Sequence, residues 1–514
     1  MFYSILFPKK EEYIHEKQAQ APTCFKDLFL DQIFAPILKA KKEFELEGFY
    51  YTSLHSPEII IYRQDVMREL EEFSLNSLFA GFAKTVYDLG RYMDNARKSL
   101  SAEGSYDNNY LTRGRMLDYA DRYCQAVSAL SKGLYSFSLR SVGLHGLADY
   151  LREYCTSDGF VSLRNRVAKL RDEFSKIHYC MLIKGGTIRI RKYEEQADHS
   201  EQLLTCFEKF RQGDVKDYRH KLSEEPTATH VEAAVLRLLA GLYKEVFDDL
   251  NNFCVEYFRF EDENIIRFSR EIQFYLSWLD FIEPLRQAGL PFCYPQICDH
   301  AKHLYNFDGF DLALARIERE NTVVNDFVLK EPERIIVVTG PNQGGKTTFA
   351  RAFGQIHYLA SLGLSVPGNK AALYLFDNIL THFGREEDLS TQNGKLQDDL
   401  VRLRTVLDKA TSKSIIIVNE IFASTTLDDA LILGQRMMDA FSELGAPTLI
   451  VTFLDELASH GEEAVSMMST VKEYDPTQRT FKIVRKPPDG LAYALHIAGK
   501  HKLTYEQLCE RLRR

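Results

Sequence analysis

Residues 335–348 combine the residue types and spacing with the clearest chemistry in this chain. The β-branched run Ile335–Thr339 leads into Gly340-Pro-Asn-Gln-Gly-Gly-Lys-Thr-Thr348, and the stretch that follows is typical of a helix. Where a strand delivers a glycine-rich loop to a helix N-terminus, backbone N–H groups and the helix dipole point at a bound anion. The sequence therefore predicts a nucleoside triphosphate site. The expected nucleotide contacts are Gly340, Pro341, Asn342, Gln343, Gly344, Gly345, Lys346, Thr347 and Thr348.

A second apolar strand, Ser414–Val418, ends in Asn419 and Glu420. In phosphate-loop ATPases this strand end supplies an Asp for the Mg²⁺ shell and then a Glu that polarises the attacking water. Glu420 keeps the second role, whereas Asn419 can hydrogen-bond a metal-bound water but brings no charge. We therefore expect Glu420 and Lys346 to be catalytic, with Thr347 and Asn419 supporting Mg²⁺. The alternative is that Glu420 only ends the strand.

A basic stretch lies between two helical parts of the sequence. Residues 161–192 hold nine Lys or Arg and two Asp or Glu, a net charge of +7 in a chain whose net charge is −9. Tyr179–Tyr193 has a strand–turn–strand pattern, with Gly185 and Gly186 at the turn. Two interpretations of this stretch stay open: it contacts a nucleic-acid backbone, or it forms a charged face in contact with solvent. The DNA-binding candidates are Lys184, Arg189, Arg191 and Lys192.

The rest of the sequence indicates an α plus α/β protein. A length of 514 residues allows roughly three or four domains. Apolar residues at three- and four-residue spacing predict an all-helical core or lever domain, and alternating strands and helices after about residue 321 predict a phosphate-loop α/β ATPase domain of ABC-like type. The expected boundaries are an arm at 1–22, the helical domain at 23–320 with a clamp-like hairpin insertion at about 161–225, and the ATPase domain with a helical tail at 321–514.

Composition and targeting signals favour a cytoplasmic protein. No apolar run is long enough to span a membrane, and the first residues lack the features of a signal peptide. The nine cysteines are scattered without a C-x-x-C pair, which is typical of reduced thiols rather than of zinc sites or disulfides.

Several segments resemble the MutS family of mismatch-repair ATPases. Thr339–Thr348 is similar to that family's variant of the phosphate loop, which begins T-G-P-N, and Leu362–Pro367 resembles its G-x-x-V-P segment. Ile415–Leu431 resembles the family's next apolar strand together with the dimer-contact loop that follows that strand. Thr448–Thr452 resembles the family's strand that ends in T-H. Asn325 matches a family Asn near the nucleotide. A weaker resemblance covers the helical part at 58–70, 272–277 and 291–295.

This resemblance implies ATP and Mg²⁺ as cofactors and a homodimer formed through the ATPase domains, with Asp429 near the interface. ATP binding and hydrolysis would gate a clamp around double-stranded or branched DNA. Three positions depart from the family. Asn419 stands where the family has an Asp, and Phe453 stands where it has a His that senses the γ-phosphate. Gly394 stands where it has a Ser that acts on the partner's nucleotide. Each change removes a polar group, so the resemblance implies a weak ATPase with slow turnover.

The chain begins close to the family's helical core, so the expectation is that mismatch-recognition and connector domains are lacking. DNA shape would then matter more than a mispaired base. A nucleotide-gated protein–protein scaffold that does not bind DNA is the alternative function, which the acidic net charge favours.

Overall fold

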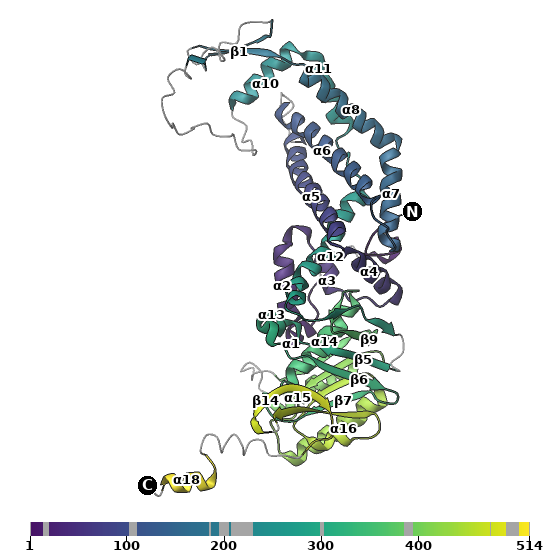
Figure 1. Ribbon diagram of the computed structural model, residues 1–514, viewed down its shortest axis with the longest axis vertical. Coiled ribbons are helices and arrows are strands. Elements are labelled where there is room, and N and C mark those ends of the chain that lie inside the picture. Colours follow the sequence, from purple (N-terminus) through teal and green to yellow (C-terminus); the bar gives the residue numbers. More distant parts are fainter. Residues whose placement is uncertain are drawn as a thin grey trace. The chain divides into compact units, whose positions relative to one another are not determined.

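The computed structural model describes residues 2–13, 20–101, 110–184, 187–194, 205–206, 230–298, 303–384, 394–472, 474–489 and 503–512 (Figure 1). The chain forms two compact units that alternate along the sequence. The first unit contains Met1–Ser77, Leu139–Leu147 and Arg270–Arg514, and the second contains Leu78–Ser138 and Ala148–Ser269. The domain boundaries expected at residues 22 and 320 stay predictions. No helix in the described ranges is long and apolar enough to cross a membrane.

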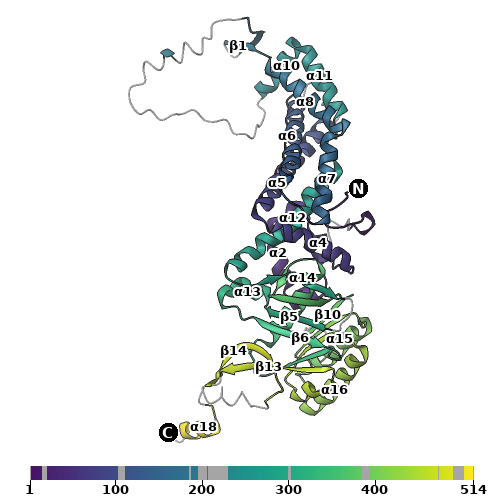
Figure 2. The same ribbon diagram turned by 45° about the vertical axis from the view of Figure 1, so that its right-hand side comes forward.

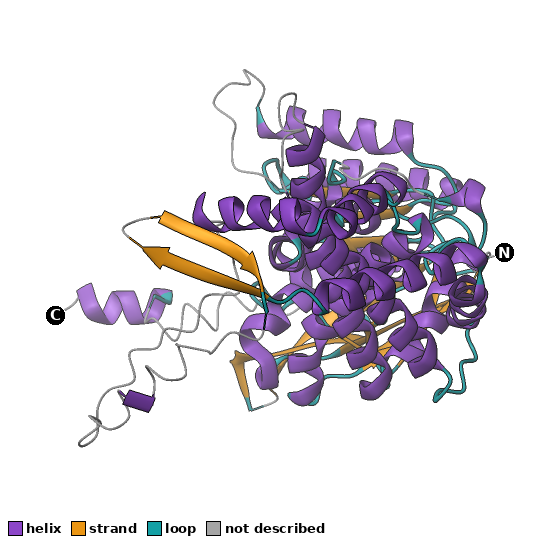
Figure 3. Ribbon diagram, turned by 90° about the horizontal axis from the view of Figure 1, so that it is seen from above, coloured by secondary structure: helices purple, strands orange, loops and turns teal. Residues whose placement is uncertain are grey.

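The second unit is mostly helical, and helices also dominate the described chain as a whole (Figure 3). Its helix α6 packs against α8 and α11. On α6, Met116, Ala120, Tyr123 and Val127 are buried at the spacing that places side chains on one helix face. The helices with residues in this unit are α5 (Phe73–Ser101), α6 (Tyr110–Leu134), α7 (Val142–Thr156), α8 (Asp158–Ser175), α10 (His230–Leu242), α11 (Lys244–Glu256) and α12 (Glu263–Gln287).

A two-stranded hairpin also belongs to the second unit. Strand β1 (Tyr179–Lys184) pairs antiparallel with β2 (Thr187–Lys192), and Lys184 faces Thr187 at the end of the pair. The expected turn at Gly185 and Gly186 lies outside the described residues. Residues 161–175, expected as part of the hairpin insertion, instead belong to α8.

The first unit contains a six-stranded sheet in the order β10-β11-β12-β7-β13-β14. Figure 2 labels its strands β10, β13 and β14. Strands β10, β11, β12, β7 and β13 run parallel to one another, and β14 pairs antiparallel with β13. Helix α14 contacts β11 and β12 on one face. The bounds are β7 (Ile335–Thr339), β10 (Ile379–Phe383), β11 (Ile415–Asn419), β12 (Thr448–Val451), β13 (Ala464–Lys472), β14 (Asp475–Arg485), α14 (Lys346–Ser361), α15 (Lys395–Lys409) and α16 (Leu427–Leu444).

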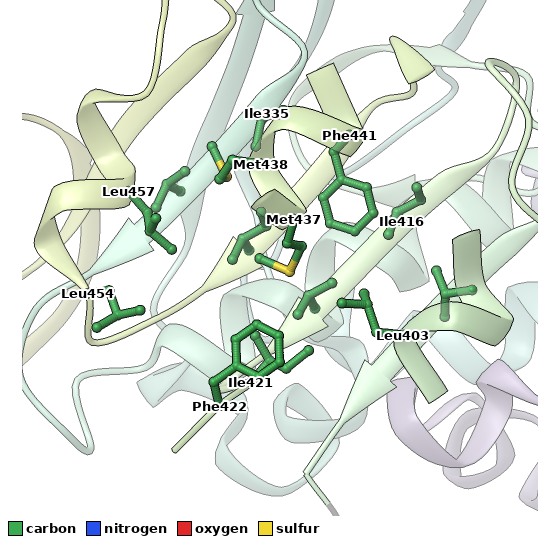
Figure 4. Close-up of a cluster of buried hydrophobic side chains, with 14 of the residues drawn as sticks. Ile335, Leu403, Ile416, Ile421, Phe422, Met437, Met438, Phe441, Leu454 and Leu457 are labelled. Carbon is green, nitrogen blue, oxygen red and sulfur yellow. The ribbon is translucent and has the colours of Figure 1, made fainter. Parts of the chain in front are cut away.

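The other face of this sheet is covered by an apolar cluster (Figure 4). Met437 and Phe441 of α16 pack with Ile416 of β11, and Leu403 of α15 completes the layer. Successive strand residues point to opposite faces, so Ile416 meets α16 while Ile417 lies against α14. Burial on both faces explains why these strands read as continuous apolar runs.

A second sheet takes some of its strands from the range expected to be helical. Its strand order is β4-β9-β5-β6, and β3 pairs with β8 in a further short ladder. Strands β3 to β5 fall between residues 292 and 309, so the expectation of an all-helical domain to residue 320 was wrong there. Pro291 and Pro295 break the helical pattern, and burial alternates along β5. The bounds are β3 (Phe292–Cys293), β4 (Gln296–Cys298), β5 (His303–Gly309), β6 (Asn325–Lys330), β8 (Val366–Pro367) and β9 (Lys370–Tyr374).

The N-terminal residues are part of the core of the first unit. Ser4 to Phe7 are buried, and the buried carboxylate of Glu271 accepts hydrogen bonds from Ser4 Oγ and Ile5 N, each at 2.9 Å. Arg63 Nε donates to Leu6 O at 3.1 Å. The other helices of this unit are η1 (Lys10–Glu12), α1 (Cys24–Leu28), α2 (Leu30–Ala40), η2 (Lys42–Phe44), α3 (Glu47–Tyr51), α4 (Pro57–Leu70), α13 (Leu312–Glu318), η3 (Arg319–Asn321), η4 (Asp455–Ser459) and α18 (Tyr505–Leu512).

Candidate functional site

The glycine-rich loop, residues 340–345, joins the buried strand β7 to the first residue of α14. Gly340 and Gly345 have φ values of 106° and 90°, which favour glycine, and Gln343 also has a positive φ of 59°. A Cβ on Gly340 would lie 2.9 Å from the backbone oxygen of Ser469, so this position has no room for a side chain. The residue order therefore produces a tight loop at the N-terminus of a long helix.

Strand β13 supports this loop through Ser469. The Ser469 hydroxyl donates to Gly344 O at 2.7 Å, and a Cβ on Gly344 would lie 2.1 Å from that hydroxyl oxygen. Gly344 is thus needed for close approach between the loop and a neighbouring strand. Ser469 could not be identified from the sequence, because nothing local to it shows that β13 lies beside β7.

Lys346 lies folded into the loop. Its side chain is buried, and Nζ donates to Gly340 O at 2.8 Å, Pro341 O at 3.1 Å and Asn342 Oδ1 at 3.3 Å. Burial lowers the pKa of Lys346, and the carboxylate of Glu420 opposes that effect. The ammonium therefore has carbonyl and amide oxygens for partners but no ion pair at hydrogen-bond distance among the described residues, and an anion in the loop would be a stronger acceptor.

Thr347 and Asn419, the two residues predicted to support Mg²⁺, lie in contact. Thr347 Oγ1 donates to Asn419 Oδ1 at 3.0 Å, and Asn419, the last residue of β11, is buried. Both are oxygen donors of the kind that Mg²⁺ accepts, and Mg²⁺ commonly takes few protein ligands together with phosphates and waters. Across the described residues there is no group of three or more His, Cys, Asp or Glu that could hold a metal. The donor set fits Mg²⁺ only alongside a bound phosphate, and its metal role stays a prediction.

Glu420 follows Asn419 in a strained backbone conformation. Its φ is 54°, and its N–H donates to Val451 O at 2.9 Å, so the neighbouring strand holds it there. Phe422 also has a positive φ, 61°, and its side chain is buried in the cluster under α16. Non-glycine residues in this region are costly and often mark functional sites. The exposed Glu420 side chain reaches the cavity described next.

A cavity of about 390 Å³ opens beside the glycine-rich loop. The loop, the start of α14 and Glu420 form one part of its lining, and Leu314, Val323 and Phe481 form an apolar part. The cavity thus combines an apolar wall with many polar side chains. Its remaining lining residues are Glu318, Asn321, Thr322, Asn325 and Thr348.

Asn325, a predicted nucleotide contact, holds β14 against β6. Its Oδ1 accepts from Ile483 N at 2.8 Å, and its Nδ2 donates to Phe481 O at 3.2 Å. The side chain thus fixes Phe481, which has a positive φ of 58° and lines the cavity. Asn325 also lines the cavity, but its amide forms hydrogen bonds with the backbone of β14.

Two charged residues near the loop were not identified from the sequence. Arg479 Nε, on β14, donates to Asn342 O at 3.2 Å. Asp455, at the start of η4, has its pKa raised mainly by burial, and the nearby Lys346 ammonium opposes that effect. Both follow the loop by more than 100 residues, and no local pattern places them there.

None of the three positions that depart from the family, Phe453, Gly394 and Asn419, is among the residues that line the cavity. Phe453 is exposed just after β12, and Gly394 is an exposed residue that precedes α15. The third, Asn419, contacts Thr347 as described above. Roles for Phe453 and Gly394 in turnover stay predictions.

The basic stretch is divided between helix and hairpin. Four of its cations form ion pairs with carboxylates on the second unit's helices, so they are partly neutralised: Arg166 and Lys169 with Asp249, Arg171 with Asp118 and Asp121, and Lys176 with Asp172. Within the described residues, no ion pair involves Lys184, Arg189 or Arg191. The hairpin therefore keeps most of the uncompensated positive charge.

The hairpin has two chemically different faces. Directly paired residues share a face, so Cys180, Leu182 and Lys184 lie with Thr187, Arg189 and Arg191. We call this the basic face. Ile188 and Ile190 lie on the opposite face and pack against the cluster around α10. Lys192 belongs to that second face, with its Nζ 5.2 Å from the ring centre of Tyr243, so it differs from the other three DNA-binding candidates.

Comparisons with known proteins agree on one family. The family model described as MutS domain V matches residues 336–506. A DNA mismatch repair protein MutS from Thermosipho melanesiensis is 24% identical over 382 residues, which is 71% of this chain and 43% of that protein. An Endonuclease MutS2 from Thermus thermophilus is 32% identical over 190 residues, which is 37% of this chain and 25% of that protein.

A DNA mismatch repair protein MutS from Brevibacillus brevis is 28% identical over 212 residues, which is 40% of this chain and 25% of that protein. The chain therefore spans less than half the length of each of these relatives. The segment that the family model matches contains nearly all of the strand, loop and helix around Lys346, together with Asn419 and Glu420. On this evidence, the chain belongs to the MutS family.

Proposed function

We propose that this chain is an ATP-dependent DNA-binding protein in which slow ATP hydrolysis gates a dimeric clamp. The observation that carries the proposal is the cavity beside the glycine-rich loop, where Lys346, Thr347 and Glu420 meet. A loop at a helix N-terminus, a lysine folded into it, and a carboxylate across the cavity are the components of a phosphate-loop ATPase. The relatives' names, DNA mismatch repair protein MutS and Endonuclease MutS2, support the link with DNA.

In this proposal the loop is a phosphate loop. Its amides and Lys346 bind the phosphates, and Lys346 exchanges the carbonyls of Gly340 and Pro341 for phosphate oxygens. Thr347 and Asn419 would hold Mg²⁺, which when bound neutralises charge on the phosphates. Glu420 orients the attacking water and accepts its proton. The apolar wall with Phe481 takes the base of the nucleotide.

Turnover is slow in this proposal because the γ-phosphate has few polar partners. Asn419 brings no charge to the metal shell, and Phe453 brings an apolar ring to the end of β12. Loss of one transition-state contact typically reduces a rate by about 10²- to 10³-fold. Binding of ATP, rather than rapid hydrolysis, would then set the state of the protein.

DNA binding is assigned to the basic face of the hairpin. Lys184, Arg189 and Arg191 lie exposed on one face of the hairpin, where a phosphate backbone can approach. Dimerisation is assigned to the ATPase part, near the start of α16. There Thr426 caps the helix by accepting a hydrogen bond from Asp429 N at 3.2 Å, while Leu427 and Ile432 are 58% and 56% exposed. Such exposed apolar side chains are available for a subunit contact.

The first test is binding of duplex and branched DNA by fluorescence anisotropy, with and without ATP and Mg²⁺, across a salt series. ATP-dependent binding that weakens steeply with salt supports the proposal. The variant Arg189→Glu should weaken binding and reduce the salt slope, whereas the control Lys84→Glu, an exposed site on α5, should not. ATP-driven dimerisation with no DNA binding would instead support a nucleotide-gated scaffold.

A further inference from the structure

Strand β14 runs along the glycine-rich loop and contributes to the site at two positions. Phe481 lies beside Gly345, since a Cβ on Gly345 would be 3.6 Å from Phe481 O. Two residues earlier, Arg479 Nε donates to Asn342 O at 3.2 Å. The strand thus spans the loop from its helix end to its tip, and the residue at the tip is a cation.

The loop tip is also where the end of Lys346 lies. Lys346 Nζ is 3.3 Å from Asn342 Oδ1, and Arg479 is bound to the backbone oxygen of the same residue. The charge of Arg479 lowers the pKa of Lys346, which places the two cations near each other. In phosphate loops the lysine reaches the outer phosphates, so a second cation beside it faces the same part of a triphosphate.

The supporting strand is fixed firmly enough to position a side chain. Arg479 pairs with Val471 of β13 at a register irregularity, and Thr470 and Thr480 are joined by their hydroxyls at 2.6 Å. Ser469, just before this irregularity, holds Gly344. Irregular pairing of this kind redirects side chains next to functional sites. The anchors on both strands hold Arg479 at the tip of the loop.

We propose that Arg479 is a phosphate-binding residue that contacts the terminal phosphate of a bound nucleoside triphosphate from within the same chain. The inference rests on the proposed nucleotide-binding function of the loop. A guanidinium is suited to this task because it is always charged and donates to phosphate oxygens in a fixed geometry. It supplies positive charge at the outer phosphates, close to a metal shell to which Asn419 brings no charge.

The test compares the affinities of ATP and ADP for the full chain by isothermal titration calorimetry, with and without Mg²⁺. Arg479→Gln should lower the affinity for ATP about tenfold or more and leave that for ADP nearly unchanged, because one charged hydrogen bond is lost. Arg479→Lys should recover part of the ATP affinity. The control Arg485→Gln alters another arginine of β14, which pairs with Glu333 away from the loop, and should change neither affinity.

Other outcomes refute the proposal in distinguishable ways. Equal losses for ATP and ADP would mean that Arg479 only holds Asn342 in place, and unchanged affinities would mean that it has no role in binding. A wild-type chain that binds neither nucleotide would contradict the proposed function itself. Circular dichroism of each variant shows whether the fold is retained, and ADP binding by Arg479→Gln provides a second check.

Discussion

Replacing Asn419 by Asp changes one charge at the site and almost nothing else. Asn419 is 8% exposed, and its Oδ1 accepts the Thr347 hydroxyl at 3.0 Å. An aspartate has the same shape and accepts the same hydrogen bond, so neither a cavity nor a clash results. The substitution therefore isolates the effect of a carboxylate beside Thr347.

Two effects of opposite sign follow from that charge. Without a metal, a buried carboxylate next to Glu420 is poorly solvated, and Lys346 offsets this only in part, so we expect a loss of about 1–3 kcal/mol in the free energy of unfolding. With Mg²⁺ and ATP, the carboxylate joins the metal shell. A charged group of this kind contributes about 10- to 100-fold in metal affinity or activity. The variant should thus be less stable than wild type without Mg²⁺ and gain more stability from it.

Urea unfolding with and without Mg²⁺–ATP measures both effects, and steady-state turnover should rise about tenfold or more. Asn321→Asp is a suitable control, because Asn321 is exposed and lines the same cavity. It adds an equal charge away from Thr347 and should change neither the metal dependence nor the turnover. If Asn419→Asp unfolds like wild type in both conditions and turns over at the same rate, Asn419 does not face the metal.

Two further predictions concern stability. Phe422→Ala and Phe422→Gly should each lower the free energy of unfolding in urea by about 3 kcal/mol or more, because the ring is buried. The Gly variant should be the more stable of the two, because φ at this residue is 61°. An Ala variant as stable as the Gly variant would show that the backbone is not strained. Burial lowers the pKa of His357 to about 4, so from pH 7 to pH 5 the unfolded chain takes up a proton that the folded chain does not. Proton uptake at His357 in the unfolded chain should therefore lower the free energy of unfolding by about 2 kcal/mol over that interval. The free energy of unfolding of His357→Leu should depend less on pH than that of wild type. An unchanged dependence would assign the effect to other groups.

The parts of the site that sequence could predict are those within a short segment. Residues 335–348 contain the strand, the glycine-rich loop and the start of the helix in one run, so residue types alone indicate their geometry. Asn419 was predicted to support Mg²⁺ with Thr347 because an apolar strand ending in a polar pair is expected near such a loop, and the structure shows the two side chains in contact, while their metal role stays a prediction. The hairpin at β1 and β2 followed from alternating residues around two glycines.

The parts that sequence could not predict depend on which strands become neighbours. Ser469 and Arg479 reach the loop only because β13 pairs with β7 and β14 pairs with β13. No local pattern gives the order of these strands in the sheet. The basic stretch shows the same limit. Its helical cations are paired with Asp118 and Asp249, which are distant in sequence, so a local charge count overstated the free positive charge.

Helix α14 determines how a ligand in the loop can act on the rest of the first unit. From Phe349 to Ser361 almost every residue of this helix is buried. Polar anchors add to that packing: Gln355 Nε2 donates to Leu28 O at 2.9 Å, and Tyr358 Oη donates to Tyr50 O at 3.0 Å. A close-packed helix with satisfied buried hydrogen bonds resists displacement relative to its neighbours.

The C-terminal end of α14 is held as firmly as its middle. Arg63 Nη1 donates to Leu362 O at 3.1 Å, and Gly363, with φ of 78°, leaves no space for a Cβ beside Arg63. The same guanidinium holds Leu6 of the N-terminal segment. Because α14 is held along its length, a response to the proposed phosphate ligand would begin in the loop and in the strained, exposed Glu420 rather than in α14. Any larger movement would carry α14 together with α1, α3 and α4 as one body.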